Sequence, residues 1–227
     1  MITPERGLIV ELDYAVPGGP EFLFETLQNM LASIDPGLRP TPLDEARYFA
    51  GRRCEAALAA YFAVRKCKKT APKAARDLAA AVRTAFTAKL PSLLTQSVRN
   101  FVKAMSADGV KMLFVTNADT WDQSFLDSMA PILVGDNASI VHEDMTLYGG
   151  VSGEAIRRLV NQIHVHHSRL VFVAGSAVSV KECLKHGIGS VAVSCRHNEY
   201  QDYSGVSAMV DSLGAQAVKK IKGILRI

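Results

Sequence analysis

The sequence predicts an α/β protein in which a parallel sheet is covered by helices on both faces, giving three layers. From residue 90 onward, short runs rich in β-branched residues alternate with segments of helical spacing, the order typical of right-handed βαβ units. Between residues 20 and 88 the spacing is almost entirely helical, which indicates a helical insertion after the first strand. The 227 residues are enough for one large core with a smaller inserted subdomain.

The first strand lies around Leu8-Ile9-Val10 and is followed at its carboxyl end by Glu11 and Asp13. Side chains alternate along a strand, so we expect both carboxylates on one side. Ligands of open α/β sheets bind beyond the carboxyl ends of the strands, which makes Glu11 and Asp13 candidate catalytic residues. They could instead cap neighbouring helices or pair with an arginine, and the residues alone leave both roles open.

The expected domains are a core of residues 1–18 and 89–227 and a helical subdomain of residues 19–88. The subdomain begins after Pro17-Gly18-Gly19-Pro20, which ends the first strand. Its helices are predicted from the spacing of apolar residues at 22–31, 49–62 and 72–88.

One helix of the subdomain has a clear start signal. Thr41 is a suitable N-cap, Pro42 a first-turn proline, and Asp44 and Glu45 are acids that the helix dipole favours. Further along, the core is predicted to contain strands and helices in alternation. The expected strands are 110–115, 132–134, 170–173 and 190–193, and the expected helices are 94–105, 121–129, 152–163, 178–186 and 215–225.

Small polar residues follow two of the core strands. Gly175 and Ser176 stand between a strand and a helix, where free backbone N–H groups attract anions. Thr116 and Asn117 follow the strand at 110–115, and residues of these types commonly hydrogen-bond loop backbone at turns. His142, Glu143 and Asp144 form a polar cluster that we expect to be a turn.

This order of segments resembles the haloacid dehalogenase-like (HAD) hydrolase superfamily over essentially the whole chain, with the smaller helical type of cap inserted after the first motif. Family members open with a strand ending in D-x-D, whose first Asp attacks a phosphoryl group while the second is the acid/base; here the segment is Glu11-Leu12-Asp13. The second motif, an apolar strand ending in Thr or Ser, matches Thr116 followed by Asn117. The resemblance implies a Rossmann-type core and a phosphate-binding role for Thr116, Asn117, Gly175 and Ser176.

The other family motifs are replaced. Gly150 falls where the family has a lysine, and Gly175 and Ser179 fall where it has the acids that hold Mg²⁺. A glutamate nucleophile is longer by one methylene, and misplacing a reacting atom by about 1 Å can cost on the order of 10²-fold in rate. Only Glu11 and Asp13 would remain as metal ligands, so we expect either no cofactor or weakly bound Mg²⁺.

The function expected from this pattern is that of a HAD-like protein with impaired catalysis that acts as a binding or regulatory protein, so the sequence argues against an active enzyme. One alternative is a divergent phosphohydrolase that cleaves a small phosphate ester through Glu11 and Asp13, with a lysine or arginine from elsewhere supplying positive charge. Another is a metal-independent, dehalogenase-like hydrolase.

The remaining features suggest no further activity. The four cysteines form no C-x-x-C pair, and no apolar run approaches the roughly 20 residues that span a membrane, so we expect reduced thiols and a cytoplasmic location. The net charge is +4, and the basic run Arg65–Lys69 comes without a nucleic-acid motif. His164, His166 and His167 are expected in a surface loop, although two of them could share a metal. A small phosphorylated ligand and a homodimer stay open as partners.

Overall fold

The computed structural model describes residues 5–93, 96–117, 138–143 and 150–227. The described strands form one parallel sheet in the order β3-β2-β1-β4-β5-β6, which confirms the predicted fold class. The strands are β1 (Gly7–Glu11), β2 (Lys111–Asn117), β3 (Ala138–Glu143), β4 (Leu170–Ala174), β5 (Gly189–Val193) and β6 (Ala208–Val210).

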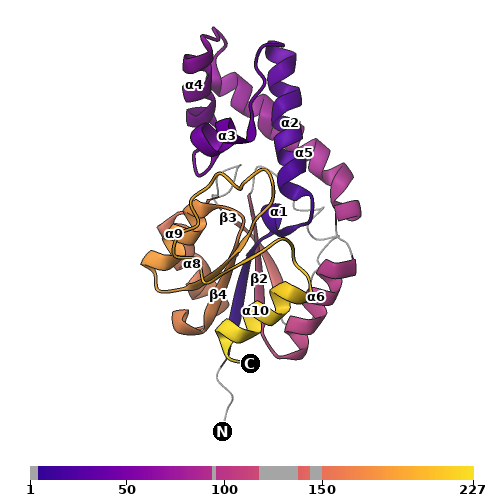
Figure 1. Ribbon diagram of the computed structural model, residues 1–227, viewed down its shortest axis with the longest axis vertical. Coiled ribbons are helices and arrows are strands. Elements are labelled where there is room, and N and C mark those ends of the chain that lie inside the picture. The colour runs from indigo at the N-terminus through magenta and orange to yellow at the C-terminus, as the bar shows by residue number, and fades with distance from the viewer. Residues whose placement is uncertain (1–4, 94–95, 118–137, 144–149) are drawn as a thin grey trace.

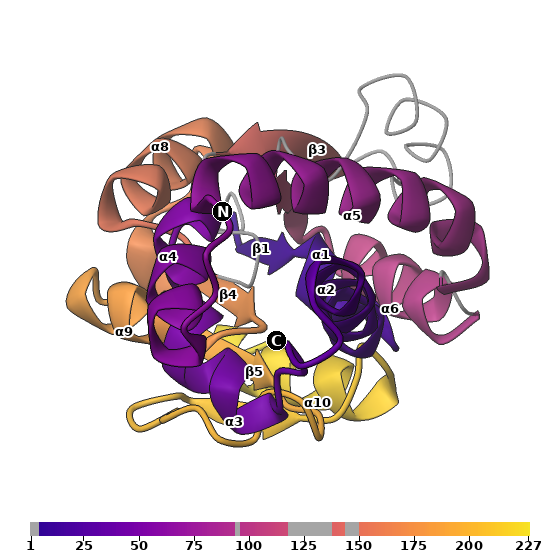
Figure 2. The same cartoon turned by 90° about the horizontal axis from the view of Figure 1, so that it is seen from above.

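Helices cover both faces of this sheet (Figures 1 and 2). Alternating side chains of β1 divide between the two faces: Leu8 and Val10 belong to one buried cluster and Ile9 to the other. The first cluster includes residues of α6 (Gln96–Ala107) and α10 (Ala215–Leu225), and the second includes residues of α8 (Gly153–Ile163) and α9 (Ala177–Lys185). The central strands are therefore buried on both faces, which agrees with their continuous runs of apolar residues.

Residues 19–93 form a group of helices beyond the carboxyl ends of the strands, which we call the helical segment (Figure 1). Its elements are α2 (Gly19–Ile34), α3 (Pro42–Asp44), the π-helix η1 (Glu45–Phe49), α4 (Cys54–Arg65) and α5 (Ala71–Leu93). The single turn α1 (Leu12–Ala15) joins β1 to this segment, and a 3₁₀ turn, η2 (His167–Arg169), precedes β4.

The local signals for the helix starts are confirmed. The Thr41 hydroxyl accepts a hydrogen bond from the Asp44 amide at 3.2 Å, and the Asp44 carboxylate accepts one from the Thr41 amide at 2.9 Å. This is a capping box, which satisfies two amide groups that the helix itself leaves unpaired. In α8, Ser152 accepts a hydrogen bond from the Ala155 amide in the same way.

The structure differs from the expected elements in three places. The helix predicted at 72–88 is present but longer, and runs from Ala71 to Leu93. His142 and Glu143, expected in a turn, are the last residues of β3, an edge strand whose short polar sequence gives little strand signal. The strand β6 was not expected, because it has only three residues. The helix and strand predicted at 121–129 and 132–134, and Asp144, lie outside the described residues.

The structure also bears on the expected absence of a transmembrane segment. Among the described residues, no helix combines the length and the apolar character needed to cross a lipid bilayer.

Candidate functional site

The topology of the sheet defines where a ligand site is expected. The chain leaves β1 for β2 and β3 on one side, and later returns to β4, β5 and β6 on the other. In open α/β sheets, this reversal opens a crevice at the carboxyl ends of the strands involved. The ends of β1, β2 and β4 meet there, and they bring Glu11, Asp13, Thr116 and the turn at Gly175 together.

Glu11 is fully buried and both of its carboxylate oxygens are engaged. The Gly175 amide donates a hydrogen bond to Oε2 at 2.7 Å, and the Ser179 hydroxyl donates one to Oε1. Burial raises the pKa of Glu11 to about 7, although these two hydrogen bonds favour the charged form. Glu11 therefore faces the turn between β4 and α9 and is held there by neutral donors.

Ser179 holds this arrangement in place. Its hydroxyl oxygen accepts a hydrogen bond from the Val151 amide at 3.0 Å, and it lies 3.2 Å from the Ser176 hydroxyl. The side chain of Ser176, in turn, caps α9 by accepting a hydrogen bond from the Ser179 amide. Three segments that are distant in sequence thus meet around one serine hydroxyl.

Asp13 lies in a different environment from the one that strand alternation predicts. β1 ends at Glu11, and Asp13 belongs to the helical turn α1, so the two-residue period does not apply to it. Its Oδ1 accepts a hydrogen bond of 2.9 Å from the hydroxyl of Thr116, and only 3% of Asp13 is exposed. Glu11 is bonded to the turn after β4, whereas Asp13 is bonded to the end of β2. Asn117 is the last residue of β2.

Gly175 has no space for a side chain. A Cβ atom at this position would lie 1.9 Å from the Cβ of Tyr14 and 2.4 Å from its Cγ. The Gly175 carbonyl accepts hydrogen bonds from Asn198 at 3.0 Å and from the Tyr203 hydroxyl at 3.1 Å. Tyr14 therefore fills the volume in which a side chain at position 175 would lie.

The amino end of α9 is also largely satisfied by the protein. The Gly175 amide bonds Glu11, the Ala177 amide donates to the side chain of Gln201 at 2.8 Å, and the Ser179 amide is capped by Ser176. Helix amino ends attract anions through such groups when they are free. Here most of the amides that could serve an anion are already used.

These contacts provide a test of whether the residues fit a Mg²⁺ ion. Mg²⁺ requires an octahedron of oxygens, commonly with one or two carboxylates. Both oxygens of Glu11 accept hydrogen bonds within the protein, Gly175 offers no side chain, and an acid there would collide with Tyr14. The described arrangement therefore does not fit a magnesium site, and we derive no reaction step through the metal.

A cavity of about 570 Å³ lies beside this network, where the loop between η1 and α4 approaches the starts of α8 and α9. Gly51 and Arg53 line it from the helical segment, and Gly150 and Val151 line it from the core. Gly150 is the residue that the resemblance to the HAD family predicts at the position of the family's lysine. Arg53 is thus a basic side chain on the wall of a cavity that borders the Ser179 network.

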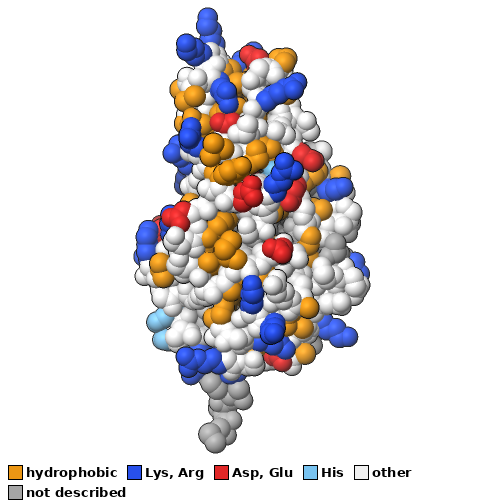
Figure 3. Space-filling view, viewed as in Figure 1, with side chains coloured by type: hydrophobic (Ala, Val, Ile, Leu, Met, Phe, Trp, Pro, Cys, Tyr) orange, Lys and Arg blue, Asp and Glu red, His pale blue; other side chains and the backbone are white. Residues whose placement is uncertain are grey.

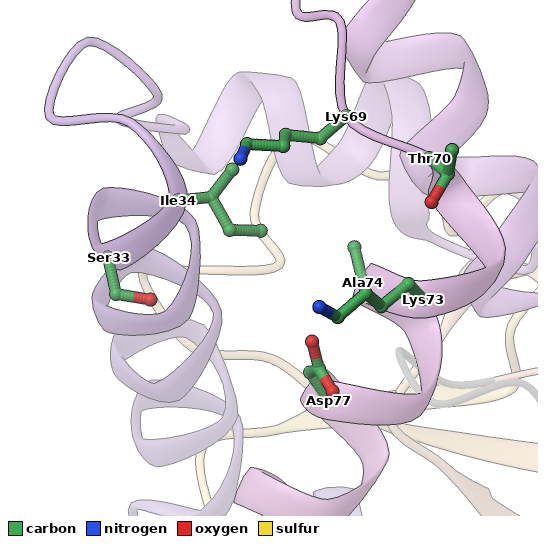
Figure 4. A pocket seen from close by; sticks show the side chains of 7 residues that line it. All are labelled: Ser33, Ile34, Lys69, Thr70, Lys73, Ala74 and Asp77. Carbon is green, nitrogen blue, oxygen red and sulfur yellow. The ribbon is translucent and has the colours of Figure 1, made fainter.

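The basic run Arg65–Lys69 lies elsewhere. A smaller cavity, of about 210 Å³, separates the end of α2 from the start of α5, and Lys69 and Lys73 line it (Figure 4). The figure shows the Lys73 amine directed toward Asp77. Because α2 leads away from the strand ends, this basic region lies at the far end of the helical segment (Figure 1).

The histidine cluster lies at the amino end of β4, opposite the carboxyl ends where the site is. His166 Nδ1 is 2.8 Å from the Ser168 hydroxyl, and the rings of His166 and His167 are 4.1 Å apart. His164 ends α8 with a φ of 54°. Within the part of the chain that the structure describes, no three His, Cys, Asp or Glu side chains are arranged to hold a metal ion.

Several residues of the site could not be identified as its members from the sequence. Tyr14, Asn198, Gln201 and Tyr203 enter it through contacts between residues far apart in the chain. The sequence identifies Ser179 only as the residue at the position of a metal-binding acid of the family. The useful signal was the Gly175 position itself, because a glycine at a strand-to-helix turn often marks a close approach of another group.

Neither the family models nor the curated protein sequences include a match to this chain. Solved structures do match it. They include CbbY from Rhodobacter sphaeroides in complex with phosphate, with a TM-score of 0.65 at 14% identity, covering 93% of this chain and 96% of that one. A phosphonoacetaldehyde hydrolase-like protein from Oleispira antarctica has a TM-score of 0.66 at 12% identity, covering 99% and 95%.

A third similar structure is a HAD family hydrolase from Deinococcus radiodurans R1 with bound phosphate and sodium. Its TM-score is 0.58 at 15% identity, and the match covers 97% of this chain and 96% of that chain. At such low identity the similarity establishes the architecture and leaves the activity open. The chain therefore has the HAD-like fold that its order of strands and helices indicates.

Proposed function

We propose that this chain is a HAD-fold binding protein that does not transfer phosphoryl groups by the metal-dependent route of the family. The observation that carries the proposal is the engagement of both Glu11 oxygens, by the Gly175 amide and the Ser179 hydroxyl. A carboxylate that attacks phosphorus needs a free oxygen in line with the leaving group. In this arrangement Glu11 holds the turn after β4 in place and is not presented to a substrate.

Electrostatics support the same conclusion. A phosphoryl transition state spreads negative charge over its oxygens, and enzymes stabilise it with cations placed beforehand. The pKa of Glu11 depends on its burial and on three neighbouring groups, Ser179, Gly175 and Asp13. None of these neighbours is basic. We therefore assign Gly175 and Ser176 to the support of Glu11, and we expect Mg²⁺ to bind weakly or not at all.

The helical segment then acts as a cap that encloses a ligand against the core. Loops and inserted helices at the carboxyl ends of a parallel sheet are where such folds bind small molecules. The cavity of about 570 Å³ between the η1–α4 loop and the core is large enough for a small organic molecule. A bound ligand of this kind would make the protein a binding or regulatory component.

Turnover assays test the proposal. Purified protein is incubated with p-nitrophenyl phosphate and a panel of small phosphate esters, with and without Mg²⁺, beside the Glu11→Gln variant. We expect the same background rate for both proteins. Turnover at ordinary enzyme rates that disappears in Glu11→Gln would overturn the proposal. A thermal-shift series with Mg²⁺, orthophosphate and a trigonal metallofluoride is expected to leave Tm unchanged.

A second function, that of a divergent phosphohydrolase, has one observation in its favour. The topology gathers Glu11, Asp13 and Thr116 at a single crevice, with the Thr116 hydroxyl 2.9 Å from Asp13. In that function Glu11 is the nucleophile, Asp13 the acid/base and Thr116 the phosphate anchor, and Arg53 is the candidate source of positive charge. The hydrogen bonds to Glu11 would have to open first. Loss of turnover in Glu11→Gln is the result that this alternative requires.

The metal-independent hydrolase remains a third proposal. In this function Glu11 would attack a carbon atom of the substrate instead of phosphorus, and a halide ion would leave. Its test is halide release from a 2-haloacid in the presence of a chelator, with Glu11→Gln as the control.

A further inference from the structure

A second group of buried polar atoms lies between the helical segment and the loop after β5. It consists of Glu21 in the first turn of α2, Glu45 at the start of η1, and Cys195 and His197 in the loop. We call these four residues the acidic cluster. Glu21 Oε2, Glu45 Oε2 and His197 Nδ1 are all inaccessible to solvent and have no hydrogen-bond partner among the described residues.

Glu45 is the most buried member of the acidic cluster, with only 1% of its surface exposed. Burial, and to a smaller extent the neighbouring Glu21 carboxylate, raise its pKa to about 8. No basic side chain of the described chain lowers this pKa. Buried polar atoms in native proteins are almost always hydrogen-bonded, so an exception in the interior calls for a specific explanation.

The surroundings of Glu45 connect this cluster to Glu11. The Tyr203 hydroxyl donates a hydrogen bond to the Gly175 carbonyl, and the pKa of Tyr203 is raised by burial and by the ionisable groups of Glu11, Cys195 and Glu45 nearby. The Cys195 thiol is hydrogen-bonded to the Glu21 side chain, and burial raises its pKa to about 11, so it stays a neutral thiol. The acidic cluster thus borders the crevice at the carboxyl ends of the strands.

Phe24 of α2 packs against the acidic cluster. The rings of Phe24 and His197 lie with their centroids 5.0 Å apart. On the face shown in Figure 3, basic side chains predominate at the far end of the helical segment, whereas acidic and basic side chains lie side by side near its junction with the core. The two buried acids are therefore the groups that favour a positively charged ligand.

We propose that the acidic cluster is a subsite for the protonated amine of a small organic ligand, held by Glu45 and Glu21 between the helical segment and the core. An ammonium group carries N–H donors and no acceptor, which suits the two carboxylate oxygens, Glu21 Oε2 and Glu45 Oε2, that lack donors. Binding of the ammonium group favours the charged form of Glu45, so Glu45 releases its proton to solvent, and the cation then offsets the repulsion between the two carboxylates. An anionic ligand would increase that repulsion, and an apolar one would leave the acceptors unsatisfied.

This inference deepens the proposed binding function and rests on it, because it names the chemical class of the ligand. A metal ion is the other cation that acids can hold. However, the described side chains include no group of three potential ligands with suitable geometry, so an organic cation is favoured.

The test uses thermal unfolding of the full chain with two amines, ethanolamine and putrescine, at millimolar concentration. Ethylene glycol and 1,4-butanediol are the uncharged controls, and sodium chloride keeps the ionic strength equal. We expect at least one amine to raise Tm by about 2 °C or more, while its uncharged control does not. No difference between the amines and the alcohols in the wild-type protein would overturn the proposal.

The variants locate the site. In Glu45→Gln the shift caused by the amine is expected to disappear, and in Glu21→Gln to fall by at least half. Glu25→Gln, which changes an exposed acid of the same helix α2, is the matched control and should keep the full shift. A shift retained in both Glu45→Gln and Glu21→Gln would refute the subsite. This result is independent of the phosphate-ester assays, which depend on Glu11, so the two proposals fail separately.

Discussion

Glu11 and Glu45 are both buried acids with raised pKa values, yet their surroundings differ in kind. Glu11 has a donor for each oxygen, from the turn between β4 and α9. Glu45 has an oxygen without any donor among the described residues, and a second acid beside it. Burial of a carboxyl group therefore does not by itself mark a reactive or binding site. The two sites differ in whether the protein supplies hydrogen-bond donors to the buried carboxyl group.

The substitution with the largest expected effect is Gly175→Ala. The new methyl group would lie 1.9 Å from the Cβ of Tyr14, which is itself buried, so the turn that holds Glu11 must move. We expect a loss of more than about 3 kcal/mol in the free energy of unfolding, measured by urea denaturation.

Its control is Gly223→Ala in α10, where a Cβ would meet nothing within 4 Å. This variant should gain up to about 1 kcal/mol, because alanine has the higher helix propensity. Equal stability of Gly175→Ala and wild type would show that Tyr14 does not pack tightly against position 175.

A smaller loss is expected for Ser179→Ala. Without the hydroxyl, Glu11 Oε1 loses a donor and the Val151 amide loses its acceptor, and both groups remain buried. The expected cost is about 2–3 kcal/mol in the free energy of unfolding. Ser92→Ala, which removes an exposed hydroxyl in α5, should be close to neutral in the same urea titration. Equal free energies of unfolding for Ser179→Ala and Ser92→Ala would contradict the role of the Ser179 hydroxyl as a donor to Glu11.

The third prediction concerns pH. The pKa values of Glu11, about 7, and Glu45, about 8, lie above their ordinary value of 4.5, so the folded state binds more protons than the unfolded state between these limits. The free energy of unfolding should therefore fall as pH rises from about 5 to about 8, by several kcal/mol, and then level off.

Glu45→Gln sharpens this prediction. It should reduce the fall in the free energy of unfolding with pH and make the protein more stable than wild type at pH 8. Asp13 and Glu21 are the acids that act on Glu11 and Glu45, respectively, and neither is altered in this variant. Urea titrations at pH 5, 7 and 9 measure the effect. A stability that rises over this range would contradict the environment assigned to Glu45.

The sequence was informative where structure depends on local signals. The apolar run at Leu8–Val10 predicted β1, Thr41 and Pro42 predicted the start of α3, and the spacing at 215–225 predicted α10. In each case, side-chain periodicity or capping within a few residues was sufficient. These signals locate single elements along the chain, whereas the order of the strands comes from the structure.

What the sequence could not show depends on contacts between distant residues. Glu45 is predicted from the sequence only as an acid that the helix dipole favours, but it is buried, close to Glu21 and to Tyr203 after β5. A signal was present: Glu45 precedes the buried Phe49 by four residues, which places both on one side of a helix. Similarly, nothing near Gly175 in the sequence indicates that Tyr14 packs against it.

The contact between Tyr14 and Gly175 links two positions that are 161 residues apart in the chain. An aspartate introduced at 175 alone would overlap Tyr14, so a carboxylate can be accommodated there only after the tyrosine is replaced by a smaller residue. The order of such mutations is thereby constrained, and a single change cannot add an acid to this crevice.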